Sequence, residues 1–541
     1  MIAAEVAVQG GVQIAGAVAA RPTLGVSVSW ELLAPVIVPV VAVMLVLLLD
    51  ALAPASWRGG RLLRRLLDGV SLLGLFAAGG FLVQQWRSPS VAPGQSTATL
   101  CGGTEDSLGL PQCAWMSSGL TLTLQSVIVL AALVTLLLTL DGSGARDRTA
   151  HHVLLLTAVT GALALAGVRD LVSLMVALEL ATLPAVGLVG LRRDAPGAQG
   201  ALTFLFTAIV SLGLLALGAG MLLLATGSLY LQQISIALSD PAVPGAARAV
   251  AVLGVMFALA GVGYKLSLVP FHLWTPDTYA GAPLPVAAFL STVSKIAGLA
   301  AVVMLLMVGT PSLGAAWAPV VGTVAVVTMT VGNVLALRQH VAVRLLAWST
   351  VAQAGWVLLP LAAGVPGATF GLLTAGNPQP VVAASVGYLA AYVAASLAAF
   401  GVVVVLSRHV AAAEEHTLDS YRGLARREPV AAAVLGFALL CLAGLPPGVV
   451  GLVAKLLAVR PLVDAGAWVF AVGAALNVAI GVAYYLRWAA LLVATPATTD
   501  DGTPAPIPTW QVRPAEGLAI AAAAVACLFL SVDPQLLAAL L

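Results

Sequence analysis

The chain has 541 residues, of which 61% are hydrophobic and 9% are charged, and its formal net charge is +2. Soluble proteins carry about 25% charged residues, so this composition excludes a soluble enzyme, a nucleic-acid-binding protein and a disordered chain. Apolar runs that approach the roughly 20 residues needed to cross a bilayer recur along the whole length. A β-barrel would show short alternating segments instead. The sequence therefore predicts an all-α, polytopic membrane protein surrounded by the lipid bilayer.

Fourteen membrane-spanning helices are predicted from these apolar runs, and no connecting loop is long enough to form a folded domain. Their approximate boundaries, in chain order, are 32–53, 67–86, 118–140, 153–168, 171–191, 199–225, 249–270, 284–308, 313–337, 341–363, 381–406, 430–459, 464–493 and 514–532.

The arginines predict how the helices are oriented. Alternate connections are rich in arginine: those after spans one, three, five, nine and eleven hold Arg58, Arg61, Arg64, Arg65, Arg146, Arg148, Arg192, Arg193, Arg338, Arg344, Arg408, Arg422, Arg426 and Arg427. The connections between them carry mostly single arginines. Because arginine-rich loops face the cytoplasm, both termini are predicted on the outer face of the membrane. An even number of spans also requires the two termini to share a side.

Two cysteines and two histidines outside the predicted spans are candidate site residues. Cys101 and Cys113 lie in the loop after span two, on the predicted outer side, where a disulfide is possible. His151 and His152 stand at the start of span four without clustered partners in the sequence, so no metal site is expected there. No CxxC pair, HExxH motif or phosphate-binding glycine loop occurs in the sequence.

Four ionisable residues fall inside predicted spans, and we call them the intramembrane quartet: Glu179, Lys265, Lys295 and Lys455. Coding bias toward arginine can explain why the loops lack lysine, but not why three lysines remain inside spans. A charge at mid-bilayer costs about 2.5–3.5 kcal/mol or more, and lysine, unlike arginine, can release its proton there. We interpret the quartet as a proton relay, in which separating a Glu179–Lys265 ion pair drives a proton toward the other two lysines. Static ion pairs that hold helices together are the alternative.

Prolines interrupt two of the spans that carry these lysines. Pro270 follows Lys265 by five residues, and Pro446 and Pro447 precede Lys455. A proline inside a span frees backbone carbonyls, and broken helices beside ionisable residues are typical of transporters. Spans seven and twelve are therefore predicted to be broken, with these prolines acting in gating. An ordinary proline kink is the alternative.

Four longer segments carry a family resemblance: ALELATLPAVGLVGLRRD, YKLSLVPFHLWTPDTYAGAPLPVAAFLSTVSKIAG, GNVLALRQHVAVRLLAWSTVAQAGW and LAGLPPGVVGLVAK. Together they resemble the antiporter-like subunits of respiratory complex I and the related Mrp-type cation/proton antiporters, over about residues 171–487. The form PFHLWTPDTYAGAP and the lysine at position 455 look most like the N-type subunit of NADH–quinone oxidoreductase. The segment before Lys455 departs from the family pattern, because it lacks the usual aromatic residues.

The resemblance implies a division of the chain into two inverted five-helix repeats. The first repeat would comprise spans four to eight within residues 141–308, and the second spans nine to thirteen within residues 309–493. Three helices in residues 1–140 would precede them, and one helix in residues 494–541 would follow. The resemblance also implies that the quartet forms a hydrated charged axis. His272 and Asp277, in the well-matched loop, would either couple this axis to the cytoplasmic face or stabilise a turn.

The implied function is that of a proton-translocating membrane-arm subunit of NADH–quinone oxidoreductase in a bacterial-type inner membrane, an enzyme only as part of the whole translocase. This chain would hold no cofactor, while FMN, iron–sulfur clusters and quinone would belong to other subunits. The expected partners are the M-type antiporter-like subunit, the small K-type subunit and the lateral helix of the L-type subunit. The alternatives are an Mrp-type cation/proton antiporter subunit without redox coupling and a structural membrane scaffold.

Overall fold

The computed structural model describes residues 28–54, 57, 60–88, 96–102, 112–140, 148–364, 380–407, 417–495 and 511–539. Arg58, Arg146 and Arg408, which contributed to the predicted orientation, lie outside these ranges. The elements up to the middle of the chain are α1 (Trp30–Leu52), α2 (Arg61–Trp86), β1 (Ser96–Gly102), β2 (Gln112–Ser118), α3 (Gly119–Leu137), α4 (Arg148–Leu165), α5 (Leu171–Gly190), α6 (Ala195–Thr226), α7 (Leu231–Ser239), α8 (Gly245–Leu266), α9 (Trp274–Gly281), α10 (Leu284–Ser291) and α11 (Val293–Val303), which continues as a π-helix, η2 (Met304–Gly309).

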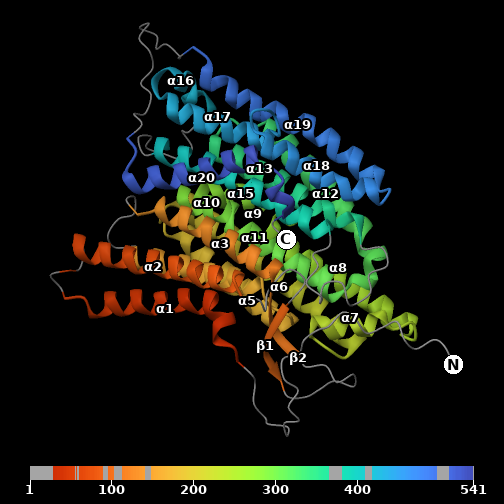
Figure 1. The fold of residues 1–541 in the computed structure, drawn as a ribbon. Coiled ribbons are helices and arrows are strands. Elements are labelled where there is room, and N and C mark those ends of the chain that lie inside the picture. The colour runs from red at the N-terminus through yellow and green to blue at the C-terminus, as the bar shows by residue number, and fades with distance from the viewer. Residues whose placement is uncertain are drawn as a thin grey trace.

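The second part of the chain is built in the same way. Its main elements are α12 (Gly314–Leu337), α13 (Ala342–Leu358), α15 (Pro380–Ser407), α16 (Leu424–Arg427), α17 (Pro429–Ala443), α18 (Val449–Asp464), α19 (Trp468–Val493), α20 (Pro514–Val532) and α21 (Leu536–Ala539). The long helices lie side by side, with α1 and α2 along one edge of the molecule and α19 along the opposite edge (Figure 1).

The polytopic helical class predicted from composition is confirmed. Within the described ranges, twelve helices are long and apolar enough to cross a membrane, and α17 is a shorter apolar helix. Every predicted span contains a helix. The two predicted spans outside the twelve are the one that became α4, whose first turns are polar, and span 430–459, which is divided between α17 and α18. Helices suit these runs because lipid offers no hydrogen-bond partners to the backbone.

Spans seven and twelve are broken, as the prolines predicted. α8 ends at Leu266 and α9 begins at Trp274, with Pro270 between them. α17 ends at Ala443 and α18 begins at Val449, and the gap between them holds two consecutive prolines, Pro446 and Pro447. Both gaps contain a cis peptide bond before a proline. The inverted relationship between the two five-helix groups stays a prediction.

A β-hairpin, which was not predicted, stands beside the helices in the loop after α2. β1 and β2 pair antiparallel with Cys101 opposite Cys113, and a disulfide joins these two cysteines. The hairpin is docked on the turn between α4 and α5, where the Met116 amide donates to the Gly167 carbonyl at 2.9 Å. A Cβ atom at Gly167 would lie 2.4 Å from the Trp115 ring, so this contact requires glycine.

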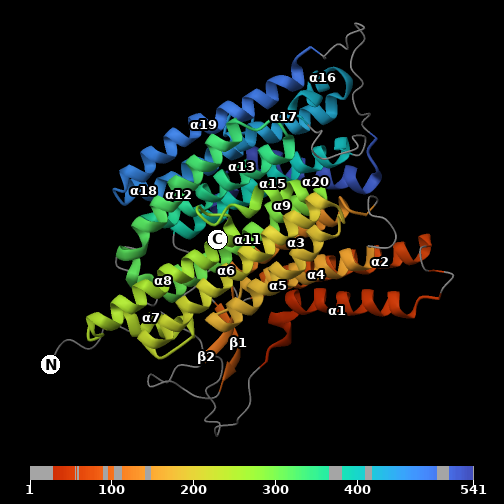
Figure 2. The same cartoon turned by 180° about the vertical axis from the view of Figure 1, so that it is seen from behind.

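Burial increases from the outer helices to the centre of the bundle. The most apolar stretch of Leu284–Gly309 is 100% buried and that of α15 is 94% buried, against 33% for α1 and 28% for α20. Both views place α9, α11 and α15 in the middle of the molecule (Figure 2). Outer helices expose large apolar side chains, including Met44, Leu224 and Val469. A lysine on a central helix is therefore surrounded by protein rather than lipid.

Candidate functional site

The three lysines of the intramembrane quartet are buried between helices. The exposed fractions of Lys265, Lys295 and Lys455 are 0%, 2% and 7%. Each ammonium also lies near the face of an aromatic ring, with distances to the ring centroid of 5.8 Å for Lys265 and Phe204, 4.9 Å for Lys295 and Trp274, and 5.7 Å for Lys455 and Trp356. Aromatic faces attract cations, so each lysine has a partial substitute for a counter-ion.

Lys265, in the last turn of α8, reaches across to α5. Its Nζ donates to the Thr182 hydroxyl at 2.8 Å and to the Ala181 carbonyl at 3.1 Å. Glu179, on the same helix, is half-buried and interacts electrostatically with Lys265. A direct pair between the two is not among the ion pairs within 4.0 Å that the described residues make. The expected ion pair is thus replaced here by bonds to oxygens about one turn further along α5.

Lys295 reaches toward the end of the helix that carries Lys265. Its Nζ donates to the Ser267 hydroxyl and to the Lys265 carbonyl, the latter at 3.4 Å. Ser267 caps α8 in the left-handed conformation, with φ of 66°. Carbonyls at a helix C-terminus carry partial negative charge, so the end of α8 attracts this ammonium. The structure therefore brings the first two lysines together at one helix end.

Lys455, on α18, is bound to the end of α17. Its Nζ donates to the carbonyls of Leu442 at 3.1 Å and Ala443 at 2.5 Å. Gly444 follows with φ of 78°, and a Cβ atom there would lie 3.1 Å from the lysine Nζ, so glycine leaves room for the ammonium. The aromatic contact missing from the preceding sequence is supplied by Trp356 of α13. The break in span twelve thus exposes the carbonyls that bind the lysine.

His272 and Asp277, from the well-matched loop, both contact the start of α13. The His272 ring is 5.6 Å from the Trp348 ring and is 7% exposed. The Asp277 carboxylate is 3.8 Å from an Arg344 guanidinium nitrogen, with both side chains about two-fifths exposed. These contacts connect the break in span seven to the second part of the chain, and a role in coupling stays a prediction.

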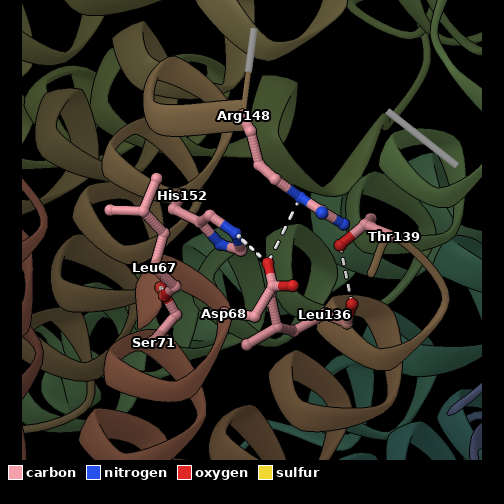
Figure 3. Close-up of polar contacts among 7 residues, drawn as sticks. All are labelled: Leu67, Asp68, Ser71, Leu136, Thr139, Arg148 and His152. Carbon is pink, nitrogen blue, oxygen red and sulfur yellow. Dashed lines mark hydrogen bonds and ion pairs between the residues drawn. The ribbon is translucent and has the colours of Figure 1, made fainter. Parts of the chain in front are cut away.

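A separate charged cluster, which the sequence did not reveal, joins α2 to α4 (Figure 3). The His152 Nε2 atom lies 2.8 Å from the Asp68 Oδ1 atom, and the Arg148 Nε atom lies 3.2 Å from the same oxygen. His152 therefore has a partner that its neighbourhood in the sequence does not contain, because Asp68 is 84 residues away. An acidic residue at the very start of a predicted span was the available signal. Across the described residues, no group of three or more His, Cys, Asp or Glu is placed to hold a metal.

The fold and the buried lysines together define a class of protein. It is a multi-pass helical membrane protein with ionisable groups beside broken helices, as in proteins that move ions or protons. The chain belongs to the NADH:quinone oxidoreductase/Mrp antiporter transmembrane family, whose model matches residues 168–481.

Curated relatives confirm the resemblance to N-type subunits. The chain is 37% identical to NADH-quinone oxidoreductase subunit N 2 of Streptomyces griseus, over 89% of this chain and 86% of the relative. It is 40% identical to NADH-quinone oxidoreductase subunit N of Salinispora tropica, over 80% of each chain. These names agree with the expected enzyme class, a subunit of an NADH-quinone oxidoreductase.

Two solved structures share the fold. A chain of respiratory complex I from Thermus thermophilus superposes with a TM-score of 0.72 and 28% identity, over 93% of this chain and 98% of that one. A chain of the Mrp complex from Dietzia sp. DQ12-45-1b superposes with a TM-score of 0.77 and 20% identity, over 95% and 96%. At that identity the second match establishes a common fold alone.

Proposed function

We propose that this chain is a proton-translocating membrane-arm subunit of an NADH–quinone oxidoreductase, and that the intramembrane quartet carries the protons. Quinone reduction elsewhere in the complex would drive the transfer, with FMN, iron–sulfur clusters and quinone held by other subunits. The observation that carries the proposal is the burial of all three lysines beside broken helices, with Lys295 bonded to the end of the helix that bears Lys265.

The first transfer follows from how the two neighbouring ammonium groups are held. Lys265 is bound by a hydroxyl and a carbonyl of α5, and Lys295 by a hydroxyl and a carbonyl at the end of α8. Two positive charges at such sites repel each other, so a proton on one disfavours a proton on the other. The half-buried carboxylate of Glu179 stabilises a charge on Lys265. Displacing that carboxylate would release the proton toward Lys295, and from there to Lys455.

The proposal extends to the surroundings of the chain. Its partners would be the M-type and K-type subunits and the lateral helix of the L-type subunit, in a bacterial inner membrane with both termini outside. The two groups of five helices, each with one broken span, would form inverted repeats. Pro270, Pro446 and Pro447 would act in gating, because they hold open the breaks beside the lysines.

Glu179→Gln tests the proposal, because it removes the charge while it keeps the shape of the side chain. We expect the assembled complex to oxidise NADH but to pump markedly fewer protons per NADH in proteoliposomes. Asp464→Asn is the matched control, since that carboxylate belongs to a solvent-exposed pair with Arg460. Wild-type pumping by Glu179→Gln would contradict the proposed relay.

An Mrp-type cation/proton antiporter subunit is the second candidate, because the family whose model matches residues 168–481 includes Mrp antiporters as well as NADH:quinone oxidoreductases. Purification in mild detergent separates the two. Co-migration with a large NADH-oxidising assembly supports the first function, whereas recovery in an antiporter complex without NADH oxidation supports the second.

A further inference from the structure

The helix α15 packs against both α11, which carries Lys295, and α18, which carries Lys455. α15 contains no Asp, Glu, His, Lys or Arg anywhere along its length. Its buried polar side chains, together with those of α13, are Ser385, Tyr388, Tyr392, Ser396, Ser349, Thr350 and Gln353. A proton that passes between the two lysines, as the proposed function requires, must therefore cross a neutral region.

The end of this region near Lys295 is a set of bonded hydroxyls. Ser291 lies one turn before Lys295, and its hydroxyl is 3.1 Å from that of Ser396 on α15. The Tyr392 hydroxyl donates to Thr350 at 3.0 Å and also interacts with the hydroxyls of Ser291 and Ser396. Hydroxyl groups both donate and accept hydrogen bonds, so these four side chains form a continuous connection from α10 to α13.

At the end of this neutral region near Lys455, the side-chain amide of Gln353 connects the neighbouring polar groups. Gln353 accepts a hydrogen bond from the Tyr388 hydroxyl, and its Nε2 donates to the Tyr485 hydroxyl at 3.0 Å and to the Leu442 carbonyl at 3.3 Å. The same Leu442 carbonyl accepts the bond from Lys455 at 3.1 Å. The amide and the ammonium therefore meet at a single backbone oxygen.

A small cavity separates the two ends. Gln353, Tyr388, Tyr392 and Leu442 line it, together with small side chains of α15 and α18, and the room for water centres in it is about 10 Å³. About 10–15 Å³ measured in this way accommodates one water molecule, provided that two to four polar partners surround it. Two phenol groups, one amide and one carbonyl meet that condition.

We propose that this cavity holds one ordered water molecule, and that Tyr392, this water and Tyr388 form a neutral proton relay between Lys295 and Lys455. Lys295 gives up one ammonium proton through the Ser291 and Ser396 hydroxyls to Tyr392, and each oxygen in the relay accepts a proton on a lone pair as its own proton leaves for the next oxygen. Tyr388, whose hydroxyl bonds Gln353 in this state, turns to pass its proton to the neutral amine of Lys455. One ammonium is lost and one is formed, so no net charge remains on the oxygens. Gln353 is a positioning residue, because its amide fixes the Tyr388 hydroxyl and the carbonyl that binds Lys455. This inference rests on the proposed function and names the groups that serve its second step.

Tyr392→Phe in the assembled complex tests the relay, since it removes one hydroxyl and retains the ring. Positioned proton-transfer groups contribute about a hundredfold or more to rate, so we expect the rate of NADH-driven proton uptake into proteoliposomes to fall at least tenfold. Tyr421→Phe is the control, because the buried Tyr421 hydroxyl has no hydrogen-bond partner in the described part of the chain. That variant should pump like the wild type.

Ala395→Val supplies a second test that leaves every hydroxyl in place. Ala395 lines the cavity, and the added methyl groups would displace the water, so the same loss of pumping is expected. Wild-type pumping by assembled Ala395→Val would overturn the water, and wild-type pumping by Tyr392→Phe would overturn the relay. Lys455→Ala, measured alongside, keeps the two proposals apart. If it abolishes pumping while the other two variants pump normally, only this inference fails, but if it pumps normally the proposed function itself fails.

Discussion

Lysine, unlike arginine, can release its proton inside a protein. Both carry a positive charge in water, but arginine retains its proton in proteins. The sequence has 24 basic residues, and its three lysines are all buried side chains within predicted spans. A static pair or a helix-packing role would be served by either residue, whereas a relay that empties and refills requires lysine.

Lys265→Arg separates these two roles at the level of one residue. The substitution keeps a positive charge beside the α5 oxygens that bind Lys265. If the charge serves only packing, the variant should pump normally once assembled. We expect it instead to lose proton pumping to about the extent of Lys265→Ala, measured as proton uptake per NADH in proteoliposomes. Pumping near the wild-type rate would argue for the packing role.

The sequence predicts the positions of the lysines but not what they bind. Each lysine stands out as a charge within an apolar run, and that signal is local. Their partners are the carbonyls of Ala181, Lys265, Leu442 and Ala443, the hydroxyls of Thr182 and Ser267, and rings from other helices. Any residue has a carbonyl, so no sequence pattern marks one as a lysine ligand. Trp356 lies about a hundred residues from Lys455, whose ammonium it contacts. The sequence around Lys455 therefore does not reveal this aromatic partner.

At the scale of elements, apolar run length and proline placement predicted the helices and both breaks. The β-hairpin was missed because its strands of seven residues each lie in a polar loop between spans. The helix α7 was missed for a related reason, since its nine residues are too few to cross a membrane. Short elements depend on tertiary contacts such as the disulfide and the docking on the α4–α5 turn, which no local pattern records.

The Asp68 cluster is expected to hold α2 against α4. Asp68→Asn removes the charge that both Arg148 and His152 face. Loss of one partner from a largely buried charged group costs about 1–3 kcal/mol or more, so the thermal unfolding midpoint of the purified chain or complex should fall. Asp464→Asn is the control, because it removes a pair with Arg460 in which the two side chains are 68% and 77% exposed. No measurable change in its unfolding midpoint is expected. Equal midpoints for the two variants would contradict this role.

Close packing of α4 on α5 depends on one glycine. A Cβ atom at Gly161 would lie 2.3 Å from the Ala181 amide nitrogen, whereas one at Gly220 would meet nothing within 4 Å. Gly161→Ala should therefore lower the free energy of unfolding by about 1–3 kcal/mol, the usual cost of overpacking. Gly220→Ala should be neutral or slightly stabilising, since alanine favours helix. Thermal unfolding of both variants side by side checks the prediction, and unchanged stability in Gly161→Ala would show that the two helices can separate freely.

At the scale of the whole molecule, the arginine distribution predicts which ends of the helices face the cytoplasm. Thr417, between α15 and α17, belongs to an arginine-rich connection, which is predicted to face the cytoplasm. Pro241, between α7 and α8, belongs to a connection on the opposite face. Both are exposed. We expect a membrane-impermeant maleimide to label Pro241→Cys in intact cells and Thr417→Cys only after the cells are opened. The reverse pattern would invert the proposed orientation and place both termini in the cytoplasm.

The innermost helices meet lipid only while the chain is being made. In the finished protein, the most apolar stretch of Leu284–Gly309 is wholly enclosed by other parts of the chain. During synthesis, the translocon nevertheless inserts each emerging segment according to its free energy of transfer into the bilayer. A lysine at the centre of a segment raises that free energy by about 2.5–3.5 kcal/mol. The apolar residues around Lys295 therefore serve biosynthesis as much as final packing. Insertion, rather than stability of the folded state, then limits how many polar groups the centre of such a bundle can accumulate.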